Sequence, residues 1–526
     1  MSSQSVAYAL IFAYYAIEAL IHGALGSAVS GGVDEFQLFE NLLVVLELML
    51  TQSPIGFWLS YCKGNLGIIG SFMLTVFLST VDEDTLHIRQ AMLQRYQRLL
   101  EKLSVRFECP ILEQRFSDLK QSIIKASDRE RVKESYARLK KVLASEANRI
   151  AQLGPSSIPE IDFADILNNG GILPEGAADA VRDAGCVVIR RVVSEETASK
   201  WEADLKQYTK SHPKVAGFPV HDPQNFSLFW TPAQVQIRSH KKVLQAMQAV
   251  IRTVQRLISS DQEYTLDAHQ DSGAIERWED GQYQECYRKI FEGKWEEYDP
   301  WNADYRSDAK TDLYDTGMSC SVFRSLQGWI SLSHTGTGEG TLRLVPSLKA
   351  STAYLMLRPF FIQDETFDDV TATFPGATPG NLQFFPTDAL HPHLEMAKTM
   401  VGIPPVKPGD YVFWHCDLIH EVDKFHPGTR DSSVSYNACT PLCQYNLENL
   451  VKTRKSFLEV GIPPDFANYT HGELEKEHAD HGAKMKNILS LEGKRALGLA
   501  PFDVDEEGIA SGQRQMRIEA NRRLGF

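Results

Sequence analysis

The stretch Pro408–Arg430, PGDYVFWHCDLIHEVDKFHPGTR, contains the features on which the fold prediction for this chain depends. It opens with a PGD turn signal and continues as the apolar run Tyr411–Trp414, which is typical of a buried strand. Two histidines follow, His415 directly after the run and His420 five residues later. Because imidazole is the commonest metal ligand in proteins, this strand is a candidate source of one.

A second polar group lies far upstream, in Thr265–Asp280, TLDAHQDSGAIERWED. His269 and Asp271 are two residues apart, and on an extended strand such residues point to the same side. Both side chains could therefore reach one ion without a bend in the backbone. Two imidazoles and one carboxylate form the facial set that holds Fe(II) with open positions. His269, Asp271 and a histidine of the later stretch are thus predicted to hold a metal.

Six segments of the chain, in a fixed order, have the pattern of one group of enzymes. They are HQDSGAIERWED (269–280), YDPWNADYR (298–306), CSVFRSLQGWISLS (320–333), GEGTLRLVP (338–346), AYLMLRPFF (353–361) and PGDYVFWHCDLIHEVD (408–423). Together they resemble the Fe(II)/2-oxoglutarate-dependent oxygenases and, more narrowly, the YbiU-like family of bacteria and fungi. The resemblance runs from about Cys109 to near the C-terminus and does not cover the first hundred or so residues.

The resemblance implies a fold and an activity. The fold is α+β, with a double-stranded β-helix (a jelly-roll, cupin-like core) buttressed by helices. The activity is a non-haem Fe(II) dioxygenase that uses O2 and 2-oxoglutarate, converts the latter to succinate, and oxidises a small polar metabolite such as an amino or hydroxy acid. A rival hypothesis keeps the same ligands in a cupin-like metal-binding protein or a Zn hydrolase without 2-oxoglutarate.

The third metal ligand has alternatives. His415 competes with His420, and the resemblance favours His420, the later histidine. Cys416 offers either a thiolate ligand or a small buried apolar side chain, the commoner role. Asp267, two residues before His269, is a further carboxylate, but the resemblance favours the His-x-Asp order.

The carboxylate of 2-oxoglutarate remote from the metal needs a cation, and a bidentate arginine is the usual partner. Arg430 lies ten residues after His420, a spacing that resembles related oxygenases. Arg343, in TLRLVP, is the alternative. The residues predicted to contact substrate are Arg277, Trp278 and Arg324.

Composition limits the class of protein and its partners. The 526 residues are 43% apolar, enough for two or more domains with a large core. A net charge of −14 without a basic block argues against nucleic acid as a partner. Eight scattered cysteines without a CxxC pair indicate reduced thiols in a cytoplasmic protein. Oligomeric state is not predicted.

Residues 1–82 differ from the rest of the chain. Gly64–Val81 is uncharged and barely long enough to span a bilayer, and no basic segment precedes the first apolar run, so no cleaved signal peptide is predicted. Three interpretations stand: a helical apolar add-on that packs on the protein or a partner, which we favour; a membrane anchor that would make the protein membrane-associated; or a segment outside the functional protein.

The predicted organisation has three parts. Residues 1–108 form the N-terminal extension, 109–157 a helical lead-in that begins its long helix at a capping box (127–130), and 158–526 the jelly-roll domain. This domain contains an insertion at about 276–319, whose tryptophans form either a lid or ordinary packing, and a helical C-terminal cover. Strands are predicted at 185–190, 320–333, 341–345, 354–357, 383–385, 412–414 and 433–437.

Overall fold

The computed structural model describes residues 109–218, 225–254, 268–316, 322–362, 366–381, 383–423, 426, 430–464, 473–478 and 482–526. These ranges belong to one compact unit, Leu103–Phe526. The predictions for residues 1–108, namely the apolar add-on, the membrane anchor and the segment outside the functional protein, lie outside the described residues. None of the helices in the ranges above combines the length and the apolar character needed to cross a bilayer.

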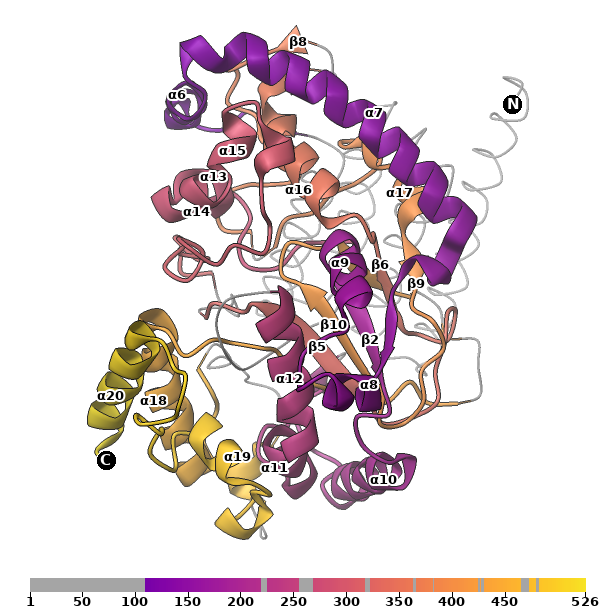
Figure 1. Cartoon of the computed structure of the whole chain (residues 1–526), viewed down its shortest axis with the longest axis vertical. Helices are drawn as coiled ribbons and strands as arrows, with labels where there is room; N and C mark the ends of the chain where they lie inside the picture. Colours follow the sequence, from indigo (N-terminus) through magenta and orange to yellow (C-terminus); the bar gives the residue numbers. More distant parts are fainter. Residues whose placement is uncertain are drawn as a thin grey trace, which may run out of the picture. The chain divides into compact units, whose positions relative to one another are not determined.

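A five-stranded sheet lies at the centre of this unit (Figure 1). Its order is β1 (Glu160–Asp162), β2 (Cys186–Arg190), β10 (Tyr411–His415), β5 (Leu326–Ser331) and β12 (Val434–Tyr436). β1 and β2 are parallel and the other neighbours are antiparallel. The strands CVVIR and YVFWH are rich in β-branched and aromatic residues and are almost wholly buried, as expected for a sheet covered on both faces.

A second, three-stranded antiparallel sheet consists of β11 (His420–Val422), β6 (Leu342–Leu344) and β9 (Val401–Gly402). The chain passes repeatedly between the two sheets, from β5 to β6, from β9 to β10, on to β11, and back to β12. The two sheets meet where the ring of Trp414 on β10 lies 5.3 Å from the ring of His420 on β11. The predicted α+β class is confirmed for the described residues.

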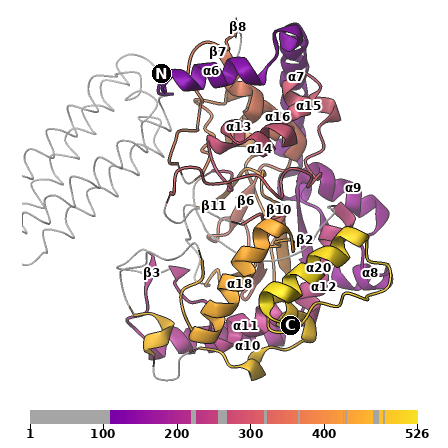
Figure 2. The same ribbon diagram turned by 90° about the vertical axis from the view of Figure 1, so that its left-hand side faces the viewer.

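Helices lie at the two ends of the sheet region (Figure 1), and those that Figure 2 also labels lie at the same ends there. At one end are α6 (Gln114–Ile123), α7 (Arg129–Leu153), α13 (Glu276–Glu279), α14 (Gly281–Cys286), α15 (Arg288–Phe291), α16 (Leu348–Leu357) and α17 (Met396–Thr399). At the other are α8 (Phe163–Asn168), α10 (Glu195–Ser211), α11 (Pro232–Ser239), α12 (Lys241–Val254), α18 (Gln444–Glu459), α19 (Leu491–Ala496) and α20 (Ser511–Leu524).

The remaining elements are short. α9 (Glu175–Ala184) leads into β2, β3 (Gly217–Phe218) pairs with β4 (Asn225–Phe226), and β7 (Phe361–Ile362) pairs with β8 (Thr366–Phe367). Single turns of 3-10 helix occur at η2 (Ala126–Asp128), η3 (Gly154–Ser157), η4 (Trp295–Glu297), η5 (Arg358–Phe360), η6 (Pro392–Leu394), η7 (Glu475–Glu477) and η8 (Met485–Asn487).

Two local predictions are wrong. The capping box at 127–130 does not form, because Ser127 lies inside the 3-10 turn Ala126–Asp128 and the residue before α7 is Asp128, whose side chain makes no capping hydrogen bond. The strand predicted at 354–357 is instead the last part of helix α16. Almost every residue of this helix is buried, so its sequence has no polar face, and a short apolar run cannot be assigned to helix or strand from periodicity alone.

The three tryptophans of the described part of the insertion, residues 276–316, are packed into the domain. Trp278, Trp295 and Trp301 are all buried. Trp278 and Trp295 belong to the apolar cluster that α7 and α16 cover, whereas Trp301 belongs to the cluster around the central sheet. The indole N–H of Trp278 donates to the carbonyl of Met356, and that of Trp301 to the carbonyl of Arg182.

A buried carboxylate links the C-terminal part of the chain to the segment before helix α11. Glu475 accepts hydrogen bonds from the backbone N–H groups of Phe229 (2.7 Å) and Trp230 (2.9 Å), just before helix α11. Burial raises the pKa of this carboxyl to about 7, although the two amides oppose the rise.

This carboxyl gives a pH-dependent contribution to stability. Because its pKa in the folded chain lies above the ordinary value of about 4.3, the stabilising contribution is fully present below about pH 4 and is lost as the pH rises through 7. Between about pH 5 and pH 8, the free energy of unfolding of the wild type should fall by roughly 2 kcal/mol more than that of Glu475→Gln. Denaturant titrations at both pH values test this, and parallel profiles would contradict it.

Candidate metal centre

The backbone brings the two predicted ligand segments side by side. The N–H of His269 donates to the carbonyl of His420 (2.9 Å), and the N–H of His420 returns the bond to the carbonyl of His269 (3.0 Å). Gln270 forms the same reciprocal pair with Phe384, at 3.0 and 3.2 Å. His269 is thus paired with His420, the first residue of β11, and Gln270 with Phe384, so residues more than a hundred positions apart in sequence become direct neighbours.

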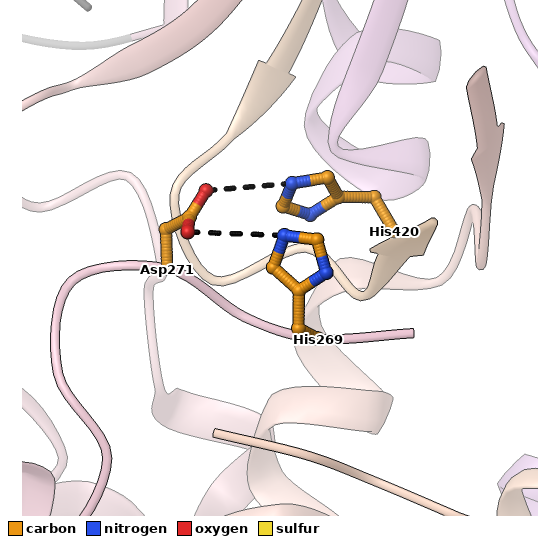
Figure 3. Close-up of side chains that lie close together, drawn as sticks. All are labelled: His269, Asp271 and His420. Carbon is orange, nitrogen blue, oxygen red and sulfur yellow. Dashed lines mark ion pairs between the residues drawn. The ribbon is translucent and has the colours of Figure 1, made fainter. Parts of the chain in front are cut away.

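The side chains of His269, Asp271 and His420 converge on one buried point (Figure 3). The Nε2 atom of His420 lies 3.4 Å from Oδ2 of Asp271, and Nε2 of His269 lies 3.8 Å from Oδ1. The two imidazole rings are 4.1 Å apart, centroid to centroid. One nitrogen or oxygen from each residue therefore faces a common centre, the arrangement that a metal ion requires.

Neighbouring groups orient two of the three side chains. Nδ1 of His420 donates to the carbonyl of Leu418 (2.9 Å), which leaves Nε2 to face the centre. The side-chain amide of Gln383 donates to Oδ1 of Asp271 at 2.7 Å. Hydrogen bonds of this kind set the tautomer of a ligating histidine and the orientation of a ligating carboxylate.

The donor set fits a divalent transition metal. Burial alone would raise the pKa of Asp271, but the imidazoles of His269 and His420 and the guanidinium of Arg324 hold it well below its usual range. The carboxylate is therefore ionised, and its Oδ2 is buried without a hydrogen-bond partner among the described residues. Two imidazole nitrogens and one carboxylate oxygen match Fe(II) better than Mg²⁺ or Ca²⁺, which prefer oxygen ligands.

Most of the chain, including the candidate metal centre, matches a known protein family. Residues 110–257 and 251–499 match the Gig2-like family. The chain belongs to the Gig2-like family. The matched residues include all three members of the cluster.

Solved and curated relatives agree with this assignment. A crystal structure of the GlcNAc-inducible protein GIG2 of Candida albicans is 36% identical, with a TM-score of 0.71, over 79% of this chain and 96% of that one. A Salmonella typhimurium LT2 protein provisionally described as an oxidoreductase is 26% identical, with a TM-score of 0.60, over 73% and 96%. The uncharacterized protein YbiU of Escherichia coli (strain K12) is 28% identical over 68% of this chain and 88% of its own length.

In this Gig2-like chain His415 does not face the metal centre. Successive side chains of a strand point to opposite faces, and Trp414 lies against His420, so His415 points the other way. Its ring meets Trp301 edge-on, Nε2 donates to the carbonyl of Pro300 (3.0 Å), and Nδ1 accepts from the backbone of Asp417 (3.0 Å). Burial lowers the pKa of His415 to about 3, so the imidazole is neutral.

A second group of potential ligands, His415, Cys416 and Asp417, also lies within 4.8 Å. Its donors are already engaged, since both nitrogens of His415 are hydrogen-bonded and two arginines neutralise Asp417. Burial raises the pKa of the Cys416 thiol to about 12, which disfavours the thiolate that a metal needs. Asp267, the alternative carboxylate, lies outside the described residues.

A buried ionic cluster that the sequence analysis missed holds the ligand segments together. Oδ1 of Asp417 pairs with Nη1 of Arg277, and Oδ2 with Nη2 of Arg306, each at 2.6 Å. The hydroxyl of Tyr287 donates to the same carboxylate at 3.2 Å. All four side chains are buried, and although burial alone would raise the pKa of Asp417, the two guanidiniums hold it well below its ordinary value.

This cluster connects both halves of the metal centre. Arg277 also donates to the backbone carbonyl of Asp271, and the amide of Gln270 donates to the carbonyl of Asp417, three residues before His420. The insertion thereby links the 269–271 segment to the 417–420 segment. A lone aspartate inside the apolar run WHCDLIH was the sequence signal, because a charge at such a position must be paired when buried.

The two arginines predicted to bind 2-oxoglutarate make other contacts in the structure. Arg343 is paired with Glu421 across β6 and β11, whereas His420 is paired with Leu344, so Arg343 lies on the face opposite His420 and bonds to Glu421 and the carbonyl of Met400. Arg430 is 59% exposed and pairs with Glu339. Arg343 therefore does not share a face with His420, and Arg430 lies at the surface.

The three predicted substrate contacts lie in different surroundings. Arg277 is engaged by Asp417 and by backbone carbonyls, and Trp278 is packed against Phe374 and Phe384 in the core. Arg324 is buried just before β5, and its charge acts on Asp271. Contact of these three residues with substrate stays a prediction. Arg324 is the one whose position favours such contact, because it acts on the candidate metal ligand Asp271.

Proposed function

We propose that this chain is a non-haem Fe(II)- and 2-oxoglutarate-dependent oxygenase that oxidises a small polar metabolite. The observation that carries the proposal is the buried convergence of His269, Asp271 and His420, two imidazoles and one ionised carboxylate. When bound, the iron and 2-oxoglutarate supply oxidation of a substrate C–H bond by O2, with succinate and carbon dioxide as products.

The residues of the chain have separate tasks in this proposal. His269, Asp271 and His420 would hold the metal on three positions and leave the others open. Gln383 and the carbonyl of Leu418 keep the carboxylate and one imidazole in orientation. All three ligands are buried, so the site is shielded from bulk water, which strengthens each interaction with charge. The provisional description of the Salmonella relative as an oxidoreductase is in agreement.

We also propose that the two sheets form the two halves of a jelly roll, the predicted double-stranded β-helix. Support comes from the path of the chain, which alternates between the sheets at β5, β6, β9, β10, β11 and β12. An antiparallel bridge between His269 and His420, the first residue of β11, adds a further backbone contact beside the smaller sheet. In such a core the inner faces of both sheets meet, and His420 and Trp414 stand at that junction.

Turnover of 2-oxoglutarate tests the function directly. Protein prepared without oxygen, loaded with Fe(II) and then exposed to O2 and 2-oxoglutarate should release succinate, and Asp271→Asn should release none above the protein-free background. The same protein loaded with Zn(II) is the control. Retention of Zn(II) during purification, with no effect of 2-oxoglutarate on thermal stability and no succinate, would contradict the proposal and favour a cupin-like binding protein or a Zn hydrolase.

A further inference from the structure

Two buried hydrogen-bond donors lie next to each other in the central sheet. Gln327 on β5 and Trp414 on β10 are directly opposite in the antiparallel pairing, and both side chains are buried. Neither Nε2 of Gln327 nor Nε1 of Trp414 has a hydrogen-bond partner among the described residues. Buried donors are nearly always paired in native proteins, so two adjacent donors without a partner call for a ligand or ordered water.

These two donors belong to the sheet face that meets the metal ligands. Residues directly opposite in an antiparallel pair point to the same face, so Gln327 shares a face with Trp414. The ring of Trp414 lies 5.3 Å from that of His420. The donors are therefore in the same interior as the metal centre, on the larger sheet, whereas His420 is on the smaller one.

A positive charge accompanies the donors. Arg324 is three residues before Gln327 in sequence, is 2% exposed, and lies near enough to act on Asp271. Two N–H donors and a buried guanidinium complement a planar anion with two acceptor oxygens, such as a carboxylate.

We propose that Gln327 and Trp414, together with Arg324, form a carboxylate-binding cradle beside the metal centre. The inference rests on the proposed function, which supplies the molecule whose carboxylate is bound. This molecule is either 2-oxoglutarate, through its remote carboxylate, or an acidic substrate. The cradle also offers a carboxylate partner other than Arg343, which lies on the strand face opposite His420, and Arg430, which is exposed and paired with Glu339.

The experiment compares matched ligands and matched variants. Mn(II)-loaded protein is titrated calorimetrically with 2-oxoglutarate and with 2-oxovalerate, which has the same 2-oxo acid group but lacks the remote carboxylate. Acetate is then titrated into protein saturated with 2-oxoglutarate. The variants are Gln327→Met and Trp414→Phe, which remove the donors, and Gln327→Glu, which places a like charge there. Trp301→Phe is the control, since that indole already donates to Arg182.

Two results support the cradle and identify the source of the carboxylate. If the carboxylate belongs to the co-substrate, Gln327→Met and Trp414→Phe each weaken 2-oxoglutarate binding by about tenfold, Gln327→Glu weakens it further, and 2-oxovalerate binding is unchanged. If it belongs to a substrate, both 2-oxo acids bind as in the wild type and acetate binding weakens by about tenfold. Trp301→Phe should change none of these affinities.

The proposal is overturned if all three cradle variants bind every carboxylate as the wild type does. Failure of the proposed function gives a different result from failure of the cradle. In that case the wild-type protein would not bind 2-oxoglutarate, but acetate would still bind to the metal-free protein, and this binding would still depend on Gln327.

A second readout does not depend on ligand binding. Since Nε2 of Gln327 is buried without a partner, Gln327→Met should leave the melting temperature of the ligand-free protein unchanged or raise it. A lower melting temperature would show that the donor serves the folded chain itself and would contradict its assignment to a ligand.

Discussion

His420→Ala is expected to lower the affinity of the folded chain for Fe(II) or Mn(II) by at least about a hundredfold, since loss of even an outer-shell partner costs roughly ten- to a hundredfold. His420 supplies one of three converging ligand atoms, and no histidine of the described residues replaces it, because His415 faces the opposite side of its strand. Calorimetric titration of the purified variant with Mn(II) measures the change.

The matched control for this prediction is His415→Gln. The two histidines are the sequence-level alternatives for one ligand, and a glutamine at 415 keeps an amide that can donate to the carbonyl of Pro300. This variant should bind Mn(II) as the wild type does. Metal affinity that is retained in His420→Ala and lost in a folded His415→Gln variant would assign the ligand to His415.

The second large effect is expected at the buried ionic cluster. Asp417→Asn removes the charge that compensates two buried guanidiniums, those of Arg277 and Arg306. Leaving a buried charge without its partner costs about 3–5 kcal/mol, so the free energy of unfolding should fall by about that amount in urea titrations. Because the cluster links both ligand segments, the Mn(II) affinity of the folded variant should fall as well, by about tenfold.

An exposed ion pair provides the control for Asp417. Arg430→Ala breaks the pair with Glu339 at the surface and should leave both stability and Mn(II) affinity close to those of the wild type. This variant should also bind 2-oxoglutarate normally, and weaker binding would favour the predicted role of Arg430 as the partner of 2-oxoglutarate. Equal losses of stability in Asp417→Asn and Arg430→Ala would contradict the role of the buried cluster.

The convergence of the three candidate metal ligands could be predicted because their signals are local. The spacing of His269 and Asp271 places both on one side of an extended segment, and an apolar strand followed by His420 is recognisable in the sequence. The choice between His415 and His420 rested on a resemblance, and the structure gives a physical reason for it. Side chains alternate along a strand, and Trp414 faces His420, so His415, the next residue, points away from His420.

The arginines and the ionic cluster could not be predicted in this way. The orientation of Arg343 depends on the register of β6 against β11, and a shift of one residue would have turned it inward. Arg277 and Arg306 lie 140 and 111 positions before Asp417, so no sequence spacing indicates their contact. Gln327 and Trp414 carry no motif, and only the pairing of their strands makes them neighbours.

The most direct test of the central claim is a crystal of the protein soaked anaerobically with Fe(II) and examined by anomalous diffraction at the iron edge. The account predicts one peak at roughly 2.0–2.3 Å, the usual range of metal–nitrogen and metal–oxygen bonds, from Nε2 of His269, Nε2 of His420 and the carboxylate of Asp271. A peak at His415, Cys416 and Asp417 instead, or none at the first three side chains, would contradict it.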